Sequence, residues 1–543
     1  MVWHERHAWS CLDDTSAQTD VLELILERGR AEPGKPAAKD TARDLSFAEL
    51  EEAVAGLAGG LSRLGVHRGD RVALHLPNSV DFLVASMACM WLGAVFVPLS
   101  RSDPATRLSF IIEDCDPKLV LTSDSERAAR DVQRDLYNGH LAIPMTGVPA
   151  GHEPPPRARD SGRPAYCIYT SGTTGRPKGV LIGHDAFACA VISAARLLEL
   201  GPETRALCVS PFHFDGSYGT LFPTPVAGGS LVIPHHESLL LPRMFFKTII
   251  EERITHTSFS PSYLRLLLSS HLMSDLSRSS MRTLGLGGEA CHAADLEQLW
   301  SFAPDLRVFN RYGPTEVTIA VTTFEVTPEV LKRGPLVPVG PPHPGVTFRI
   351  LDAHGDAVEQ TEKVGELYIG GTQLMVGYWG DPDLTATVLR TDFVPGELLY
   401  KTGDLVYQDD WGDCVYVDRA DRVVKRSAVR ISVAEIDHAL RRFPGVSAAV
   451  CLPFDQSGRL AIAAFIVSDA PMSELEFRKH ALDHLPPTMI PDVFRLIDAL
   501  PMTSVSKVDE RALLASAGLA ELGAGAPQWE RVVAADDSQA SFF

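Results

Sequence analysis

Alternating helical and strand patterns between residues 40 and 125 constrain the possible fold more than any other feature of this sequence. The amphipathic pattern from Phe47 to Leu64 predicts a helix. The apolar runs Arg71–His75 and Leu119–Thr122 predict strands, the second entered from a turn at Asp116-Pro117. Helices and strands that alternate in this way bury their apolar faces against one another in layers. We therefore expect an α/β fold.

An uncharged stretch of eighteen residues, Phe82 to Leu99, is close to the length of a membrane span. Asn78 and Asp81 fit the start of a helix, with Asp81 three residues after the capping position, and Gly93 fits its end. The residues from Ala94 to Pro98 then form a separate apolar run. We therefore expect a buried helix followed by a buried strand, and no membrane span.

The pattern of the chain changes after residue 340. Short strand patterns occur at Phe348–Leu351, Gly365–Gly370 and Cys414–Val417, with a hairpin turn at Asp410–Asp413. After Arg419 the composition becomes more charged, and the end of the chain has little periodicity, as is typical of a tail. We expect an N-terminal domain over residues 1–420, a smaller C-terminal lobe over 421–517 and a tail over 518–543.

Length, charge and cysteine usage exclude several classes of protein. A chain of 543 residues exceeds one hydrophobic core, which predicts two or more lobes. The 69 acidic and 50 basic residues give a net charge of −19, which argues against a general nucleic-acid surface. The nine cysteines lack zinc or CxxC spacing, and Met1–Arg6 lacks the order of a signal peptide. We expect a cytoplasmic protein with reduced thiols and no nucleic-acid or membrane partner.

The segment Tyr169–Gly179 carries four Ser/Thr hydroxyls, three glycines and two cations within eleven residues. It follows the apolar run Ala165–Ile168, which predicts a buried strand. Glycines let backbone N–H groups approach a phosphate, and hydroxyls and Lys178 add donors and positive charge. The spacing is not that of a Walker A loop. The composition alone fits a flexible surface loop equally well, so the rest of the chain must decide.

Four further motifs follow at wide spacing: Asn310–Glu316, Tyr400–Leu405, Asp418–Lys425 and Leu500–Asp509. The five motifs, in this order, resemble the acyl-adenylate-forming superfamily. This superfamily comprises nonribosomal peptide adenylation domains, acyl- and aryl-CoA ligases, and luciferases, and the resemblance covers roughly residues 20 to 515. It implies a large N-terminal body of layered sheets and helices with a β-rich subdomain, and a small mobile C-terminal α+β lobe.

The resemblance also implies ATP and Mg²⁺ as cofactors and a set of residues that bind them. A carboxylate must attack the α-phosphate of ATP, so the charge of two approaching anions must be neutralised. Glu316 would hold Mg²⁺, Thr315 would contact the α-phosphate, and Arg419 would lie near the ribose. Tyr312 would stack on adenine, Asn310 would bond its edge, and Asp404 would accept from both ribose hydroxyls. The residues that would close over the β- and γ-phosphates are Thr170, Ser171, Gly172, Thr173, Thr174 and Lys178.

Three residues near the C-terminus match moving parts of the superfamily. Lys507 would lie between the substrate carboxylate and the α-phosphate and stabilise the transition state. Asp421 matches the hinge about which the small lobe rotates between the two half-reactions, and Lys425 lies on the face brought inward for thioester formation. Ala428 replaces a glycine that normally lines the path of the thiol, and Ser506 replaces a glycine before the lysine.

The run Phe214-Asp215-Gly216-Ser217 resembles the amino-acid-activating branch, in which the aspartate pairs with the substrate ammonium. Four glycines among the pocket positions predict room for a bulky or long side chain, or for a β-amino acid. Arg311 either pairs with a second carboxylate or is a structural arginine. The pocket positions that the resemblance implies are Asp215, Gly216, Gly219, Ser258, Gly285, Gly287, Arg311, Ile319 and Ala320.

We predict ATP-dependent adenylation of an amino acid, either an α- or a β-amino acid, with release of pyrophosphate. The aminoacyl group would pass to the phosphopantetheine thiol of a separate carrier protein, in trans, because no carrier motif follows Lys507 and no condensation domain precedes the core. Such reactions belong to natural-product biosynthesis. Two alternatives are an acyl- or aryl-CoA ligase, against which Asp215 argues, and a non-catalytic nucleotide-binding protein, against which Lys507 argues.

Overall fold

The computed structural model describes residues 20–123, 137–150, 153–158, 162–170, 176–352, 354–419, 423–426, 429–456, 459–468, 473–501 and 508–519. Contacts divide the chain into two compact units. The first unit contains residues 1–170, 177–421 and 425–430, and the second contains residues 171–176, 422–424 and 431–543. The domain boundary predicted at residue 420 stays a prediction, because residues 420–422 lie outside the described ranges.

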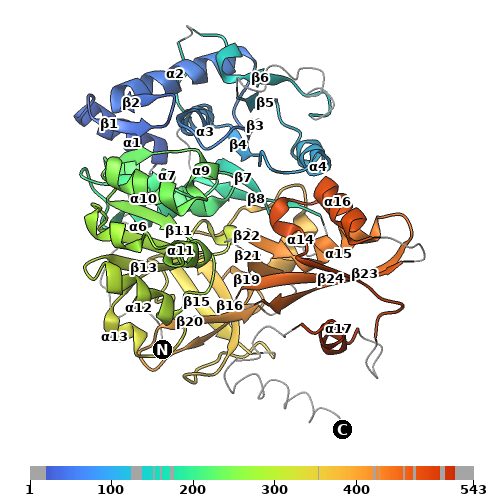
Figure 1. Ribbon diagram of the computed structural model, residues 1–543. Coiled ribbons are helices and arrows are strands. Elements are labelled where there is room, and N and C mark those ends of the chain that lie inside the picture. The colour runs from blue at the N-terminus through green and yellow to red at the C-terminus, as the bar shows by residue number, and fades with distance from the viewer. Residues whose placement is uncertain are drawn as a thin grey trace. The chain divides into compact units, whose positions relative to one another are not determined.

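A seven-stranded sheet forms the N-terminal part of the first unit, in the order β17-β8-β7-β4-β3-β5-β6 (Figure 1). Its central strands are parallel, and most of their residues are apolar and buried, as expected for a sheet covered on both faces. The strands predicted at residues 71–75 and 119–122 are confirmed. The elements are β3 (Arg71–His75), β4 (Val95–Pro98), β5 (Leu119–Thr122), β6 (Ala142–Pro144), β7 (Pro164–Thr170), β8 (Lys178–Gly183), β17 (Gly377–Tyr378), α2 (Phe47–Arg63), α3 (Val80–Leu92) and α4 (Ala105–Cys115).

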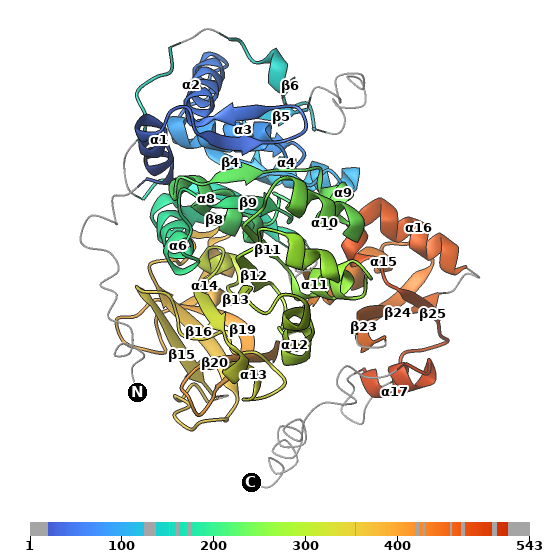
Figure 2. The same ribbon diagram turned by 60° about the vertical axis from the view of Figure 1, so that its left-hand side comes forward.

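An eight-stranded sheet follows, in the order β14-β13-β12-β11-β9-β10-β1-β2. Apolar side chains of α10, α11 and α12 form one core with β12 and β13, and Figure 2 shows these helices along that side of the sheet. The elements are β1 (Pro36–Lys39), β2 (Asp44–Ser46), β9 (Arg205–Cys208), β10 (Ser230–Val232), β11 (His256–Phe259), β12 (Thr283–Gly287), β13 (Arg307–Tyr312), β14 (Thr322–Val326), α1 (Val21–Ala31), α6 (His184–Leu197), α10 (Pro242–Glu251), α11 (Pro261–Leu268) and α12 (Ala293–Phe302).

A smaller antiparallel sheet completes the first unit, which confirms the predicted β-rich segment. Gly412 has a left-handed φ of 84° in the predicted turn between β19 and β20. The strands are β15 (Val346–Leu351), β16 (Gly365–Gly371), β18 (Leu389–Arg390), β19 (Leu399–Gln408) and β20 (Cys414–Arg419), and β21 (Val423–Arg426) pairs with β22 (Val429–Ser432). The short helices of this unit are α7 (Tyr218–Leu221), α8 (Pro223–Val226), α9 (His236–Leu239), α13 (Pro328–Leu331) and α14 (Pro382–Val388).

The uncharged stretch that resembled a membrane span is the buried helix α3 followed by the buried strand β4, as predicted. Gly93 ends the helix with a left-handed φ of 68°, a conformation that glycine adopts without steric cost. Within the described ranges, no helix combines the length and the apolar character needed to cross a membrane.

The N-cap of α3 is Ser79, so the prediction that Asn78 caps the helix is wrong by one position. The Ser79 hydroxyl accepts a hydrogen bond from the Phe82 N–H at 3.2 Å. Asn78 instead donates to the Ser210 carbonyl and accepts from the Phe212 N–H, both at 2.9 Å. Asn78 therefore fixes the loop that leads to Asp215.

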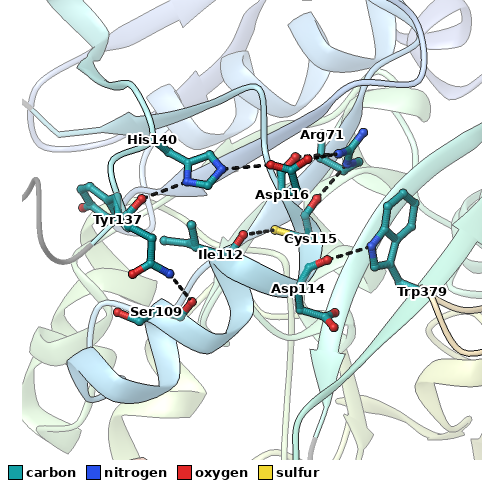
Figure 3. A network of polar contacts seen from close by, with 10 residues as sticks. Arg71, Ser109, Ile112, Asp114, Cys115, Asp116, Tyr137, His140 and Trp379 are labelled. Atoms are coloured by element: carbon teal, nitrogen blue, oxygen red, sulfur yellow. Dashed lines mark hydrogen bonds and ion pairs between the residues drawn. The ribbon is translucent and has the colours of Figure 1, made fainter.

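The C-terminal end of α4 is held by two side chains from other elements (Figure 3). The last carbonyls of a helix have no partner within the helix. Here the Arg71 guanidinium donates to the Cys115 and Asp116 carbonyls at 2.8 and 2.6 Å, and the Trp379 indole donates to the Asp114 carbonyl at 3.1 Å. Trp379 directly follows β17, so this contact ties β17 to α4.

The second unit contains a three-stranded sheet in the order β23-β24-β25, with three helices. Its core includes Leu452, Phe454, Phe465 and Leu513. This small α+β unit agrees with the predicted fold class. The predicted tail falls mostly on residues 520–543, outside the described ranges. The elements are β23 (Val446–Asp455), β24 (Leu460–Ser468), β25 (Val493–Leu496), α15 (Val433–Arg441), α16 (Glu474–His484) and α17 (Glu510–Ser516).

Candidate active site

The Ser/Thr/Gly segment joins the antiparallel strands β7 and β8. Thr170 and Lys178 are cross-strand partners at its two ends. The Thr170 hydroxyl is shielded from solvent and has no hydrogen-bond partner in the described part of the chain. The predicted phosphate-binding residues Ser171, Gly172, Thr173 and Thr174 lie outside the described residues.

Lys178, Glu316 and Tyr378 form a buried polar cluster. The Lys178 Nζ lies 3.0 Å from Glu316 Oε1 and 2.5 Å from the Tyr378 hydroxyl, which in turn lies 2.9 Å from Glu316 Oε1. The Glu316 side chain is fully buried and that of Lys178 is 12% exposed. The two predicted residues therefore meet as an ion pair, which keeps each buried charge compensated.

Tyr378 was missed by the sequence reasoning. It lies 62 residues from Glu316 and 200 residues from Lys178. No local pattern reports contacts over such separations, and the only sequence signal was an aromatic pair, Tyr378-Trp379, between two glycines. The Trp379 contact with α4 holds the neighbouring Tyr378 in position.

Glu316 fits the predicted role of a Mg²⁺ ligand in one respect. It is a single buried carboxylate, and Mg²⁺ commonly takes one or two carboxylates together with substrate phosphates and water. The described residues contain no group of three or more metal-ligating side chains. A metal here would therefore depend on the phosphates of ATP for most of its coordination.

A pocket opens beside Asn310 and Tyr312 at the end of β13. The amide nitrogen of Asn310 donates to the Val337 and Pro338 carbonyls at 3.1 and 3.0 Å. Both amide protons are therefore in use, and Asn310 can offer a ligand only its carbonyl oxygen. The aromatic walls are Tyr312 and Tyr416, whose ring centroids lie 6.1 Å apart. Further lining residues, which the sequence reasoning missed, are Gly288, Glu289, Ala290, Cys291, Val339 and Tyr416.

Asp404 is fully buried and has protein partners on both carboxylate oxygens. The Tyr312 hydroxyl donates to Oδ2 at 2.5 Å, and Arg419 Nη1 donates to Oδ1 at 2.7 Å. Asp404 and Arg419 are cross-strand partners in β19 and β20. Burial and the nearby Asp404 charge raise the pKa of Tyr312 well above its usual value, so the phenol stays a donor. These three predicted residues form one network at the edge of the pocket.

Arg311 lies between Asn310 and Tyr312 in β13, and neighbours in a strand point to opposite faces of the sheet. Its side chain therefore points to the other face of the sheet, where Nη1 lies 3.3 Å from the Gly219 carbonyl. Ser258 and Gly285 are register partners in β11 and β12, and Gly287 is the register partner of Arg311. The structure thus brings these predicted pocket residues together.

The expectation that four glycines leave room for a bulky ligand needs correction. A Cβ at Gly219 would lie 2.6 Å from Arg311 Nη1, and one at Gly285 would lie 2.4 Å from Ser258 Oγ. A Cβ at Gly287 would lie 2.9 Å from the Arg311 carbonyl oxygen. Three of the glycines therefore make room for Arg311 and Ser258, and only Gly216 faces open space.

Asp215 presents a carboxylate to the same region. The Thr315 hydroxyl and the backbone N–H groups of Ile319 and Gly216 are close enough to Asp215 to act on its pKa, and each of them lowers it. The residue is partly exposed, but its Oδ2 is shielded and has no hydrogen-bond partner among the described residues. Burial raises the pKa of Asp215 to about 7, and the nearby charge of Glu316 acts in the same direction.

A strained turn aims the Ile319 N–H at Asp215. Thr318 and Ile319 have φ values of 62° and 69°, in a region that β-branched residues rarely occupy. The buried amide of Gln373 donates to the carbonyls of Val317, Thr318 and Ala320 at 3.4, 3.2 and 2.8 Å. Gln373, which the sequence reasoning also missed, therefore holds the turn that carries the predicted residues Ile319 and Ala320.

The side chains of three predicted residues lie outside the described part of the structure. Asp421 and Lys507 lie outside the described residues. Lys425 lies in β21, and its side chain is likewise outside the described part. The predicted roles of these residues and of the pocket residues stay predictions.

Comparison with known proteins identifies the family. Residues 26–379 match the family described as AMP-binding enzyme. Enterobactin synthase component F of Escherichia coli O157:H7 is 33% identical over 512 residues, which cover 91% of this chain and 39% of that protein. The chain spans between 6% and 45% of the length of eight curated relatives that it matches.

Solved structures share the fold. An artificially fused adenylation–PCP di-domain from Klebsiella oxytoca superimposes with a TM-score of 0.78 at 22% identity, covering 88% of this chain and 94% of that chain. The o-succinylbenzoate CoA synthetase of Bacillus subtilis gives a TM-score of 0.79 at 24% identity, covering 90% and 97%. With the family match over most of its length, the chain belongs to the AMP-binding enzymes, the acyl-adenylate-forming superfamily of ligases.

Proposed function

We propose that this enzyme activates an amino acid with ATP, forming an aminoacyl-AMP and releasing pyrophosphate. The observation that carries the proposal is Asp215, whose shielded Oδ2 has no hydrogen-bond partner among the described residues. A shielded carboxylate oxygen with unused hydrogen-bonding capacity suits a substrate ammonium. An acid without an amino group would leave Asp215 unpaired and would bind poorly.

The nucleotide would occupy the pocket beside Asn310. The Asn310 carbonyl oxygen would accept from the exocyclic amine of adenine, and the ring would lie against Tyr312. Asp404, already held by Arg419, would accept from the ribose hydroxyls. These contacts would place the α-phosphate on the side of Thr315, close to the carboxylate of an amino acid bound at Asp215.

Bond formation then requires little beyond positioning and charge neutralisation. A carboxylate oxygen of the amino acid attacks the α-phosphorus, and the bond to the β-phosphate breaks as pyrophosphate leaves. Lys178 would supply positive charge to the leaving phosphates, and Lys507 would stabilise the charge at the reacting centre. When bound at Glu316, Mg²⁺ would neutralise phosphate charge.

We further propose that the aminoacyl group passes to the phosphopantetheine thiol of a carrier protein supplied in trans. The thiol sulfur attacks the acyl carbon, and AMP leaves. The proposal is supported by the likeness to a peptide-synthetase relative and to an adenylation–PCP fold. Asp421 and Lys425 would serve this step. A β-amino acid remains our finer proposal for the substrate, from the Phe214–Gly219 segment.

Exchange of labelled pyrophosphate into ATP tests the proposal. A panel of α-amino acids, β-amino acids and des-amino acids of matched chain length should support exchange only when the amino group is present. The discrimination should be at least roughly a hundredfold, the scale of an unpaired buried charge. Asp215→Asn should erase most of it by weakening amino-acid use. Equal exchange with des-amino acids would favour the CoA-ligase alternative, whose fold is also shared.

A further inference from the structure

Arg311 is a buried cation without an anionic partner. The residue is 8% exposed, and its Nε has no hydrogen-bond acceptor among the described residues. Its only hydrogen bond in the described part of the chain is the long one to the Gly219 carbonyl. A neutral carbonyl does not compensate a full positive charge that has been removed from water.

Other shielded arginines of this protein have an anionic partner. Arg107, Arg163 and Arg419 have side chains that are 8%, 3% and 3% exposed, and each pairs with an aspartate. No described carboxylate lies within ion-pair distance of Arg311. The contrast indicates that the missing anion is supplied from outside the chain.

The residues around Arg311 leave its guanidinium protonated, and they do not compete with it for a substrate carboxylate. Burial lowers the pKa of Arg311 to about 10, which leaves the guanidinium protonated at neutral pH. Burial and the nearby Arg311 charge lower the pKa of His256 to about 3, so this neighbour is neutral. Gly219 and Gly285 supply no side chain, and any Cβ there would crowd the arginine or Ser258.

The cation lies close to the proposed ammonium site. Asp215 and Gly219 are four residues apart in a continuous helical segment, which places them about one turn, roughly 6 Å, apart on the same face. Arg311 donates to the carbonyl of that Gly219. The Asp215 carboxylate and the Arg311 guanidinium therefore lie close enough together for one small molecule to contact both.

We propose that the substrate is an amino dicarboxylic acid, whose ammonium pairs with Asp215 and whose non-reacting carboxylate pairs with Arg311. The inference rests on the proposed function. The planar guanidinium offers two parallel N–H donors to a carboxylate, including the unpartnered Nε. The other carboxylate of the substrate is left to react with ATP.

The test is pyrophosphate exchange with three matched sets of acids. The first set is aspartate and glutamate. The second is their side-chain and main-chain amides, in which one carboxylate is neutral. The third is monocarboxylic α- and β-amino acids of the same chain length. The wild-type enzyme should prefer the dicarboxylic acids in kcat/KM by roughly a hundredfold, the scale for a buried ion pair that lacks one partner.

Substitution separates recognition from a structural role. Arg311→Gln should lose about a hundredfold on the dicarboxylic acids and change exchange with the amides little, whereas Arg311→Lys should keep part of the preference. Arg307→Gln is the matched control, because Arg307 lies in the same strand and pairs with Glu199 and Glu325 at the surface. This control should leave the preference unchanged.

Two results would overturn the inference. Equal kcat/KM values for monocarboxylic and dicarboxylic amino acids in the wild-type enzyme would show that Arg311 does not bind a second carboxylate. The proposed activation of an amino acid would be unaffected by that result. If only des-amino acids support exchange, the proposed function fails together with the inference. Exchange by the wild-type enzyme with the three sets of acids tests recognition of a second carboxylate even if the Arg311 variants do not fold.

Discussion

Asp215 has a pKa that burial raises from 3.8 to about 7. Between these values the folded protein binds a proton that the unfolded chain has released, so the free energy of unfolding falls as the pH rises through this window. We predict that Asp215→Asn, which is neutral at every pH, raises the melting temperature at pH 8 and raises it much less at pH 5. Thermal unfolding at the two pH values measures this difference.

A wild-type protein that is more stable than Asp215→Asn at pH 8 would show that the folded state favours the ionised carboxylate without ligand. Asp185→Asn is a suitable control, because Asp185 carries a carboxyl group at the surface, where it accepts from the Gly162 N–H. A substitution that adds stability and removes amino-acid use is the expected signature of a group kept for function.

Lys507 is the residue for which the sequence makes the strongest catalytic prediction. We predict that Lys507→Ala abolishes adenylate formation and leaves ATP binding measurable, because the lysine acts on charge that develops in the transition state. A loss of about 3 kcal/mol or more in transition-state stabilisation is the scale for such a group. Pyrophosphate exchange and equilibrium nucleotide binding measure the two effects, and exchange near the wild-type rate would remove Lys507 from the mechanism.

At the scale of elements, the turn at Thr318-Ile319 depends on Gln373. We predict that Gln373→Ala lowers the free energy of unfolding by roughly 1–3 kcal/mol, because the carbonyls of Val317 and Ala320 lose the side-chain donor that Gln373 gives them. It should also raise KM for the amino acid, since the turn aims a donor at Asp215. Denaturant unfolding and exchange kinetics give both quantities. Gln298→Ala, on the exposed side of α12, should change neither.

The elements themselves were largely predictable from sequence, because short-range patterns determine them. The strands at residues 71–75 and 119–122 and the left-handed Gly93 follow from local apolar runs and turn chemistry. The cap of α3 was misplaced by one residue, because Asn78 and Ser79 are both good caps and a distant loop recruits Asn78.

The candidate site was only partly predictable. Motifs named Lys178 and Glu316, but their partner Tyr378 comes from a segment far away in sequence, as does Gln373, which holds the turn at Thr318-Ile319. The glycine pocket was misread for a related reason. Sequence shows where side chains are absent, whereas only the fold shows that Arg311 fills much of that space.

At the scale of the whole molecule, the predicted hinge at Asp421 separates the two half-reactions. We predict that Asp421→Pro, which fixes φ and removes an N–H, leaves pyrophosphate exchange within about twofold and lowers carrier or CoA thioester formation by at least about tenfold. Parallel assays of pyrophosphate exchange and thioester formation measure the difference between the two half-reactions. Equal loss in both assays would indicate that Asp421 supports folding and does not act as a hinge.

The side chains along β13 alternate between the two faces of the sheet, and this alternation restricts how related enzymes can change their substrate. In the proposed function, Asn310 and Tyr312 serve the nucleotide pocket, and Arg311, whose side chain points to the opposite face of the strand, serves the proposed amino-acid pocket. Inserting or deleting one residue in this strand would exchange the two sets of side chains and destroy both pockets at once. If Arg311 recognises the substrate as proposed, substitution at position 311 alone would change the acid that is recognised and leave the nucleotide contacts in place. Selection for a new substrate is therefore expected to proceed by point mutation in this strand, with its length held constant.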